Sequence, residues 1–320
     1  MNVIKSLILI VCLGLSAFGY SYQQTEYNKQ MQEAINNDNV KIVRSLIESK
    51  NIDIEEFIED LENCETPLLY ASKLGKYDVV KYLIEAGANV NVFDDSDRTP
   101  LHLILKDDEM KEKQLLKICQ MLIQAGSDVN CADFLGQTPL MIACKYQDKY
   151  AAVIEFIIAS GAKVEARDDK GSTPLILASE YNNIVALKVL AKNNVDFGAV
   201  NNDGLNALLM AAREGEIRTV SYFIHELGIN INQKTRSGMT PLMSAIVGKQ
   251  DEMIEYLVFQ GADVNVKTIL PITVLIRNPN LFIDFYPKKE VIAAGTTTLN
   301  IAKKYSSYAI VELLISAGAR

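Results

Sequence analysis

Apolar residues recur along this chain at the spacing of short amphipathic helices. In residues 77–86, Val79, Val80 and Leu83 share one helical face, and Gly87 follows directly. A glycine there can adopt the left-handed backbone conformation that ends a helix. Comparable segments end in the same way at Gly126, Gly161, Gly261 and Gly318. The pattern predicts a series of short helices, each with one apolar face.

A second motif precedes each of these helices. In its commonest form it reads Thr-Pro-Leu followed by mostly apolar residues. It begins at Thr66, Thr99, Thr138, Thr173, Asn206, Thr240 and Thr297, at spacings of 33, 39, 35, 33, 34 and 57 residues. Thr before Pro is a helix N-cap, and Pro at the first helical position loses no hydrogen bond. Each predicted helix pair is too small to bury its own apolar stripe, so the pairs must stack.

This period and motif resemble those of the ankyrin-repeat family, whose signature is T-P-L-H-x-A. The resemblance covers residues 28–320 and implies an all-α solenoid of stacked helix-turn-helix units with finger turns. We expect about eight repeats, with a degenerate N-terminal cap at 28–60 and an insertion at 266–296.

The finger turns differ in their glycine content. Residues 133–136, 168–171 and 201–204 end in glycine, where a positive φ is needed. Asp97 and Cys64 stand at that place in two other fingers, which predicts looser turns there.

The insertion contains a β-branched segment, 269–276, and an apolar-aromatic segment, 281–286, with Pro279 between them. This pattern indicates a hairpin or a lid. Two interpretations remain open: an elongated finger packed on its own stack, or a flap that contacts a partner.

The N-terminus has the pattern of a secretory signal. Lys5 precedes an uncharged apolar run, and small residues at 17 and 19 suit cleavage, so we expect residues 1–19 to be removed. Residues 20–27 then form a short leader. The expected location is the periplasm or the medium. The alternatives are an uncleaved membrane anchor and a lipoprotein modified at Cys12.

Composition narrows the function. The net charge of −8 does not favour general nucleic-acid binding, and two His offer little for metal sites. The four Cys that remain after cleavage are expected as free thiols, with a Cys119–Cys144 bridge as the alternative. Because phosphate-binding loops, zinc-protease pairs and nucleophile elbows are missing from the sequence, we expect no enzyme and no cofactor or metal.

His102 occupies the His of the T-P-L-H signature, and the resemblance implies that it hydrogen-bonds a neighbouring turn. The six other copies carry Leu69, Met141, Ile176, Leu209, Met243 and Asn300 at that place. These residues predict a more apolar stack with fewer such hydrogen bonds.

The resemblance implies a monomeric scaffold that binds another protein through its concave face, made of finger turns and first helices. Matched positions there are Asp95, Arg98, Phe134, Leu135, Gln137, Lys145, Tyr146, Asp169, Lys170, Tyr181, Asn202, Asp203, Arg213, Arg236 and Met239. Phe134, Leu135, Tyr146 and Tyr181 are the expected anchors, because aromatic and large apolar side chains often dominate binding. The alternatives are an accessory or inhibitor of a periplasmic enzyme and a secreted effector that acts on a host protein.

Overall fold

The computed structural model describes residues 22–50, 54–55, 58–59, 64–106, 110–145, 151–276 and 288–320. The chain divides into two units, residues 1–139 with 159–162, and residues 140–158 with 163–320. The expected signal at 1–19, the Cys12 alternative, the apolar-aromatic segment 281–286 and the expected anchor Tyr146 lie outside the described residues.

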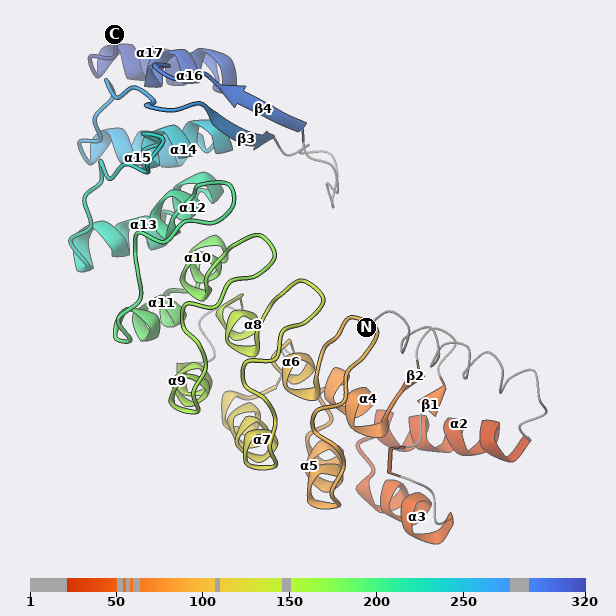
Figure 1. Ribbon diagram of the computed structural model, residues 1–320. Coiled ribbons are helices and arrows are strands. Elements are labelled where there is room, and N and C mark those ends of the chain that lie inside the picture. The colour runs from red at the N-terminus through yellow and green to blue at the C-terminus, as the bar shows by residue number, and fades with distance from the viewer. Residues whose placement is uncertain are drawn as a thin grey trace. The chain divides into compact units, whose positions relative to one another are not determined.

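The first unit consists of helix pairs that stack through like helices (Figure 1). Its elements are α2 (Tyr22–Asn36), α3 (Val40–Lys50), β1 (Ile58–Glu59), β2 (Cys64–Glu65), α4 (Pro67–Lys73), α5 (Tyr77–Glu85), α6 (Pro100–Ile104) and α7 (Glu112–Gln124). The first helices α2, α4 and α6 contact one another in that order, and α3, α5 and α7 do the same. The short strands β1 and β2 pair antiparallel.

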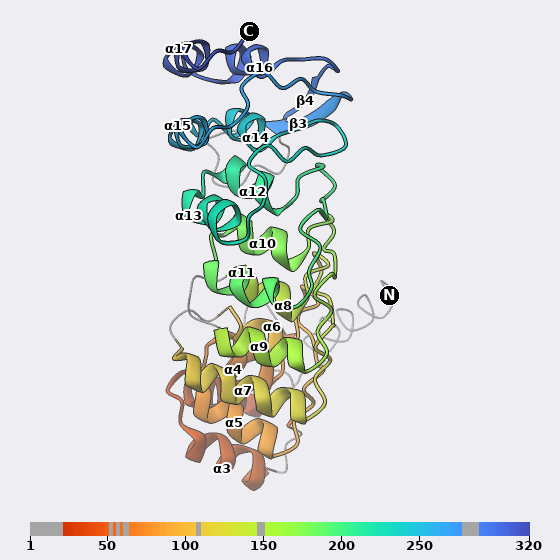
Figure 2. The ribbon, with the colours of Figure 1, turned by 90° about the vertical axis from the view of Figure 1, so that its left-hand side faces the viewer.

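The second unit continues this pattern. Its helices are α8 (Pro139–Lys145), α9 (Ala151–Ala159), α10 (Pro174–Glu180), α11 (Ile184–Ala191), α12 (Ala207–Glu214), α13 (Ile217–Ser221), α14 (Pro241–Gly248), α15 (Asp251–Phe259), α16 (Thr298–Tyr305) and α17 (Tyr308–Ser316). A π-helical turn, η1 (Tyr222–Glu226), continues α13, and the strands are β3 (Ile272–Ile276) and β4 (Lys288–Ile292). Figure 2 shows α10, α12, α14 and α16 following one another, in agreement with their contacts. The predicted all-α repeat solenoid is confirmed.

The motif residues begin the first helices as their chemistry predicts. The Oγ1 atoms of Thr66, Thr173 and Thr240 each accept a hydrogen bond from the backbone N–H three residues later. Asn206 replaces Thr in one copy, and its Oδ1 accepts the same bond from Leu209 N at 2.9 Å. These caps satisfy backbone donors that a helix start otherwise leaves without partners.

The apolar residues that replace His in most motif copies are buried. Leu69, Met141, Ile176, Leu209 and Met243 are at most 1% exposed. Hydrogen bonds between repeats also form in the loops that follow the second helices. Asn91 Nδ2 donates to Gly126 O, and Asn130 Nδ2 donates to Gly161 O. Asn265 Nδ2 makes the matching bond to Gly318 O. The stack is therefore more apolar at the motif, as predicted, and asparagines cross-link its loops.

One repeat contains an extra residue in its second helix. The distance from the N-cap to the glycine that ends the pair is 21 residues for Thr240 and Gly261, but 22 for Asn206 and Gly228. The π-helical turn η1 accommodates this residue, and Phe223 stays fully buried within it. An insertion inside a helix commonly produces such a π-bulge.

The insertion forms a hairpin, and its second strand lies at Lys288–Ile292. Residues 272–276 pair antiparallel with 288–292, in the register Ile272↔Ile292. Ile272, Val274 and Ile292 are buried. The hairpin is tied to its own unit, because Ile269 N donates to Ser237 O at 2.7 Å and Lys304 Nζ lies 2.7 Å from Glu290 Oε2. These contacts agree with the elongated-finger interpretation.

Two further expectations concern the leader and the cysteines. Residues 22–27, expected as a leader, form the start of α2, and Tyr27 is buried. Cys119, Cys131 and Cys144 carry free thiols, so the alternative Cys119–Cys144 bridge is absent. Burial raises the pKa of the Cys119 thiol to about 12 and also raises that of Cys144.

Candidate functional site

Each well-formed finger turn is organised by its first side chain. In the finger 133–137, Asp133 Oδ1 accepts hydrogen bonds from the backbone N–H groups of Leu135 and Gln137, both at 2.9 Å. Two backbone bonds close the turn, from Asp133 N to Gln137 O and from Gly136 N to Asp133 O. Gly136 has φ +73°, a conformation that favours glycine. Asp168 and Asn201 organise their fingers in the same way.

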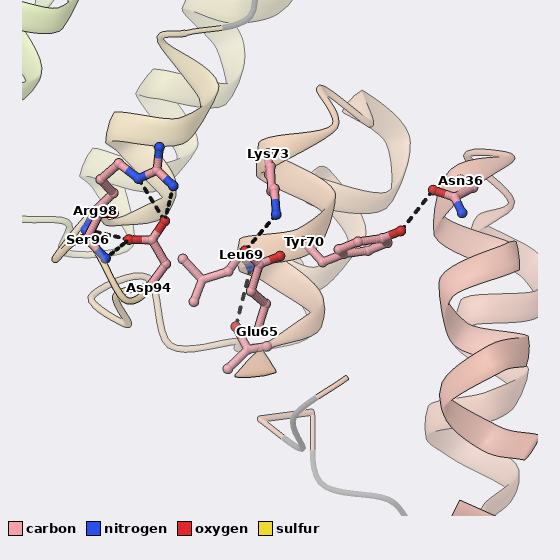
Figure 3. Close-up of polar contacts among 9 residues, drawn as sticks. Asn36, Glu65, Leu69, Tyr70, Lys73, Asp94, Ser96 and Arg98 are labelled. Atoms are coloured by element: carbon pink, nitrogen blue, oxygen red, sulfur yellow. Dashed lines mark hydrogen bonds and ion pairs between the residues drawn. The ribbon is translucent and has the colours of Figure 1, made fainter. Parts of the chain in front are cut away.

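The finger 94–98 has the same turn without a glycine, so the prediction of a looser turn there is wrong. Asp97 adopts φ +57° at the place of Gly136, and its N–H donates to Asp94 O at 3.0 Å. Asp94 Oδ1 accepts from the N–H groups of Ser96 and Arg98. Figure 3 shows the additional contact of the Arg98 guanidinium with the same carboxylate, in which Nη2 lies 2.6 Å from Oδ2. The other finger expected to be looser, 61–64, lies largely outside the described residues.

Neighbouring fingers are joined by backbone hydrogen bonds. In the first unit Phe134 N donates to Ser96 O at 2.9 Å. In the second unit Asn202 N donates to Lys170 O at 2.9 Å, and Ile269 N donates to Ser237 O at the root of the hairpin. Main-chain hydrogen bonds therefore hold the finger tips in register, and the side chains at the tips take no part in these bonds.

Most of the predicted contact residues lie at the surface. In the first unit Asp95, Phe134 and Leu135 are exposed, Phe134 to 67% and Leu135 to 49%. In the second unit the exposed residues are Asp169, Lys170, Tyr181, Asn202 and Arg236, while Lys145, Asp203 and Arg213 are half-buried. Lys145 Nζ lies 5.3 Å from the centre of the Tyr181 ring, so these two side chains meet on one surface.

Two of the predicted contact residues are buried in the structure. Met239 is 3% exposed and Gln137 is 7% exposed, so neither side chain is presented to a partner. Both precede the motif Thr directly. Arg98 occupies the same place and is half-buried, with its guanidinium engaged by Asp94. Because their side chains are buried, Met239 and Gln137 are removed from the candidate surface.

His102 joins two fingers of the first unit. The backbone N–H of Thr99 donates to Nδ1 at 3.2 Å, so Nε2 carries the proton and donates to Gln137 O at 3.1 Å. The side chain is fully buried, and desolvation lowers its pKa. The predicted structural role of His102 is confirmed.

Comparison with known proteins decides the family. A family model for ankyrin repeats (three copies) matches residues 30–111, 108–200 and 186–268. The chain belongs to the ankyrin-repeat family. The chain is also similar to Rabankyrin-5 from Mus musculus, at 29% identity over 208 residues. That match covers 65% of this chain but only 14% of the relative, so the chain spans a small part of that protein.

Ankyrin repeats generally mediate protein–protein interaction, and ankyrin-repeat proteins are typically non-enzymatic scaffolds. In the described ranges no group of three or more His, Cys, Asp or Glu side chains is arranged to hold a metal ion. Over the same ranges we find no helix with the length and apolar character needed to cross a bilayer.

The residue directly before each finger was not among the predicted contact residues. Phe93 is 57% exposed and Val200 is 38% exposed, so both add apolar surface beside the fingers. Arg167 occupies the same position and donates from Nη1 to Gly171 O and Val200 O, both at 2.7 Å. The sequence pattern that would have revealed this exposed apolar surface is an apolar residue directly before the buried Asp or Asn that begins a finger.

Tyr70 and Lys73, on the first helix α4, were also missed (Figure 3). Tyr70 OH donates to Asn36 Oδ1 at 3.2 Å, and Lys73 Nζ lies 3.0 Å from the buried Glu65 carboxylate. Both side chains have partners inside the fold, so they shape the first-helix surface and hold it in place.

Proposed function

We propose that this ankyrin-repeat chain is a scaffold that binds a partner protein through its finger tips and the exposed ends of its first helices. The observation that carries the proposal is the exposure of Phe134 and Leu135 at the tip of a hydrogen-bonded finger. The finger 94–98 forms the same turn with Asp95 and Ser96 at these places. The turn does not need apolar tip residues, and exposed apolar side chains without a packing role often mark contact surfaces.

The chemistry of this surface suits a protein with mixed polar and apolar contacts. In the first unit Phe93, Phe134 and Leu135 supply apolar area beside Asp95. In the second unit the exposed Tyr181 is accompanied by the charged groups of Lys170 and Asp169. Rigid aromatic anchors inside a polar surround are the usual composition of a protein-binding surface.

We further propose that the chain acts after export, as the sequence pattern of residues 1–19 supports. A periplasmic or secreted scaffold is the first candidate. An accessory or inhibitor of one periplasmic enzyme, and a secreted effector acting on a host protein, use the same surface. The intact mass of the exported protein tests this part, and a product that retains residues 1–19 or carries lipid on Cys12 contradicts it.

Partner capture combined with amide hydrogen exchange tests the binding surface. The full chain would be used to isolate partners from the cell envelope and the medium, and exchange would then be compared with and without the purified partner. We expect new protection at the tip amides of Leu135 and Lys170, while α9 and α11 exchange as before. Protection confined to the second helices would refute the proposed surface.

A further inference from the structure

Among the described residues, two second helices carry a strongly exposed aromatic residue, Tyr308 at the first position of α17 (79% exposed) and Phe259 near the end of α15. Phe259, in α15, is 87% exposed. It lies two residues before the left-handed residue that ends its helix pair. The equivalent residues in the other described repeats are Glu85, Gln124, Ala159, Lys192, Glu226 and Ser316. No other repeat places an aromatic side chain there, so Phe259 has no general role in stacking.

Phe259 lies in a partly aromatic region formed by two neighbouring elements. Tyr256 is one turn earlier on the same helix and is half-buried. Its hydroxyl lies 3.4 Å from Nε2 of His225, an exposed residue of η1. This contact places His225 beside α15, and we call His225, Tyr256 and Phe259, with the acids described next, the outer patch. Figure 1 shows α13 and α15 in successive layers of the second unit.

The rim of the outer patch is acidic. Glu252 and Glu255 are exposed on α15, and Glu226 is exposed at the end of η1. Within the described ranges, none of these three carboxylates forms an ion pair. The position of Glu255, six residues before the left-handed residue, carries Lys81 and Lys188 in two other repeats and Glu155 and Glu312 in two more. The acidic character of the rim therefore comes from the combination of Glu252, Glu255 and Glu226 around Phe259, and not from Glu255 alone.

We propose that the outer patch docks a basic protein segment that also carries an apolar side chain. The apolar side chain would cover Phe259, and Lys or Arg side chains would pair with Glu252, Glu255 and Glu226. Charge complementarity selects this occupant. Anionic headgroups and nucleic-acid phosphates are repelled by the same carboxylates. A second copy of the chain carries a net charge of −8 and fits less well.

This surface is separate from the finger surface of the proposed function, because it belongs to second helices. The two can therefore be tested independently with the full chain. The probe is a fluorescent amphipathic peptide of Lys and Leu, read by anisotropy. Two control peptides keep either the Leu pattern, with Glu in place of Lys, or the Lys pattern, with Ser in place of Leu.

We expect the Lys/Leu peptide to bind and both control peptides to fail. Phe259→Ala should weaken binding about tenfold or more, while Phe259→Leu should retain it. Glu252→Gln with Glu255→Gln should also weaken it and reduce its dependence on salt. Phe134→Ala, which removes another exposed phenylalanine, is the matched control and should leave the affinity unchanged. Unaltered melting temperatures would show that each variant folds.

Four results would overturn the proposal. Equal affinity of Phe259→Ala and the parent chain would remove Phe259 from the site. Equal binding of the Lys/Ser peptide would reduce the interaction to bulk charge. An equal loss in Phe134→Ala would place the peptide on the fingers. Self-association in sedimentation that Phe259→Ala abolishes would make the patch a contact between copies of the chain.

Discussion

The fingers 94–98 and 133–137 have the same main-chain structure and different tips. Asp94 and Asp133 each accept two backbone N–H groups, and a residue at positive φ closes each turn. One tip presents Asp95 and Ser96, whereas the other presents Phe134 and Leu135. The comparison teaches that the first residue of a finger determines its shape and that the tip residues are left to determine what it contacts.

The largest effect should come from the helix that follows each finger in the chain. Leu101 and Leu140 are fully buried behind their Thr-Pro caps. Leu101→Ala and Leu140→Ala should each lower the free energy of unfolding by ~2–5 kcal/mol, because both leave a cavity. Chemical denaturation measures this. A small cost at one site and a large cost at the other would show that the two repeats do not share one packing scheme.

The next largest effect should come from the first finger residues. Asp133→Ala leaves two backbone N–H groups without their acceptor and should cost ~1–3 kcal/mol. Asp94→Ala should cost more, because the Arg98 guanidinium also loses its carboxylate. Asp95→Ala is the control and should cost less than Asp94→Ala, because the turn amides of Ser96 and Arg98 bind the Asp94 carboxylate. If Asp94→Ala and Asp95→Ala have the same unfolding free energy, the carboxylate does not organise the turn.

His102 connects the two fingers, and its replacement should change how stability depends on pH. Desolvation lowers the pKa of folded His102 below its ordinary value of 6.5, so the unfolded chain binds the proton more readily. His102 therefore reduces stability as the pH falls below about 6.5, and the effect is absent above it.

His102→Leu, which imitates the motif copy with Leu69, should remove that part of the pH dependence. At neutral pH it should cost about 1 kcal/mol through the lost hydrogen bonds. Unfolding free energies of the parent chain and the variant, measured across this pH range, provide the check. Parallel pH profiles would contradict the assignment.

The smallest effect should come from the residue at positive φ in the finger 94–98, where a replacement should raise the stability slightly or leave it unchanged. Asp97 has a backbone φ of +57°, a conformation that glycine adopts with less strain. The equivalent residue of the finger 133–137 is Gly136. Asp97→Gly should therefore stabilise the finger or leave it neutral, within about 1 kcal/mol. Gly136→Asp is the reciprocal change and should destabilise by a similar amount. A large loss in Asp97→Gly, measured by thermal unfolding, would show that the Asp97 side chain supports the turn.

The repeat architecture could be predicted because its determinants are local. Thr66 and Pro67 specify a helix start, and Gly87 specifies a helix end, whatever lies around them. The recurrence of such signals at a regular period then requires stacking. His102 was interpreted correctly for the same reason, since its motif residues surround it in sequence.

The errors concern contacts that depend on the neighbouring layer. Met239 and Gln137 were assigned to the surface, but both side chains are buried in the folded stack. The second hairpin strand, Lys288–Ile292, has a charged beginning and no alternating apolar pattern that would reveal it. Phe259 was overlooked because one aromatic residue in a helix does not reveal its exposure until the helix face is known.

Whether the finger tips bind the partner can be measured with two matched finger variants and the captured partner. Phe134→Ala with Leu135→Ala removes the apolar tip, and Asp95→Ala with Ser96→Ala truncates the polar tip of the same turn. We expect the first variant to lose at least ~2 kcal/mol of binding free energy while its melting temperature hardly changes, and we expect the second variant to bind more nearly like the parent chain. Full-strength binding by the Phe134/Leu135 variant would contradict this expectation.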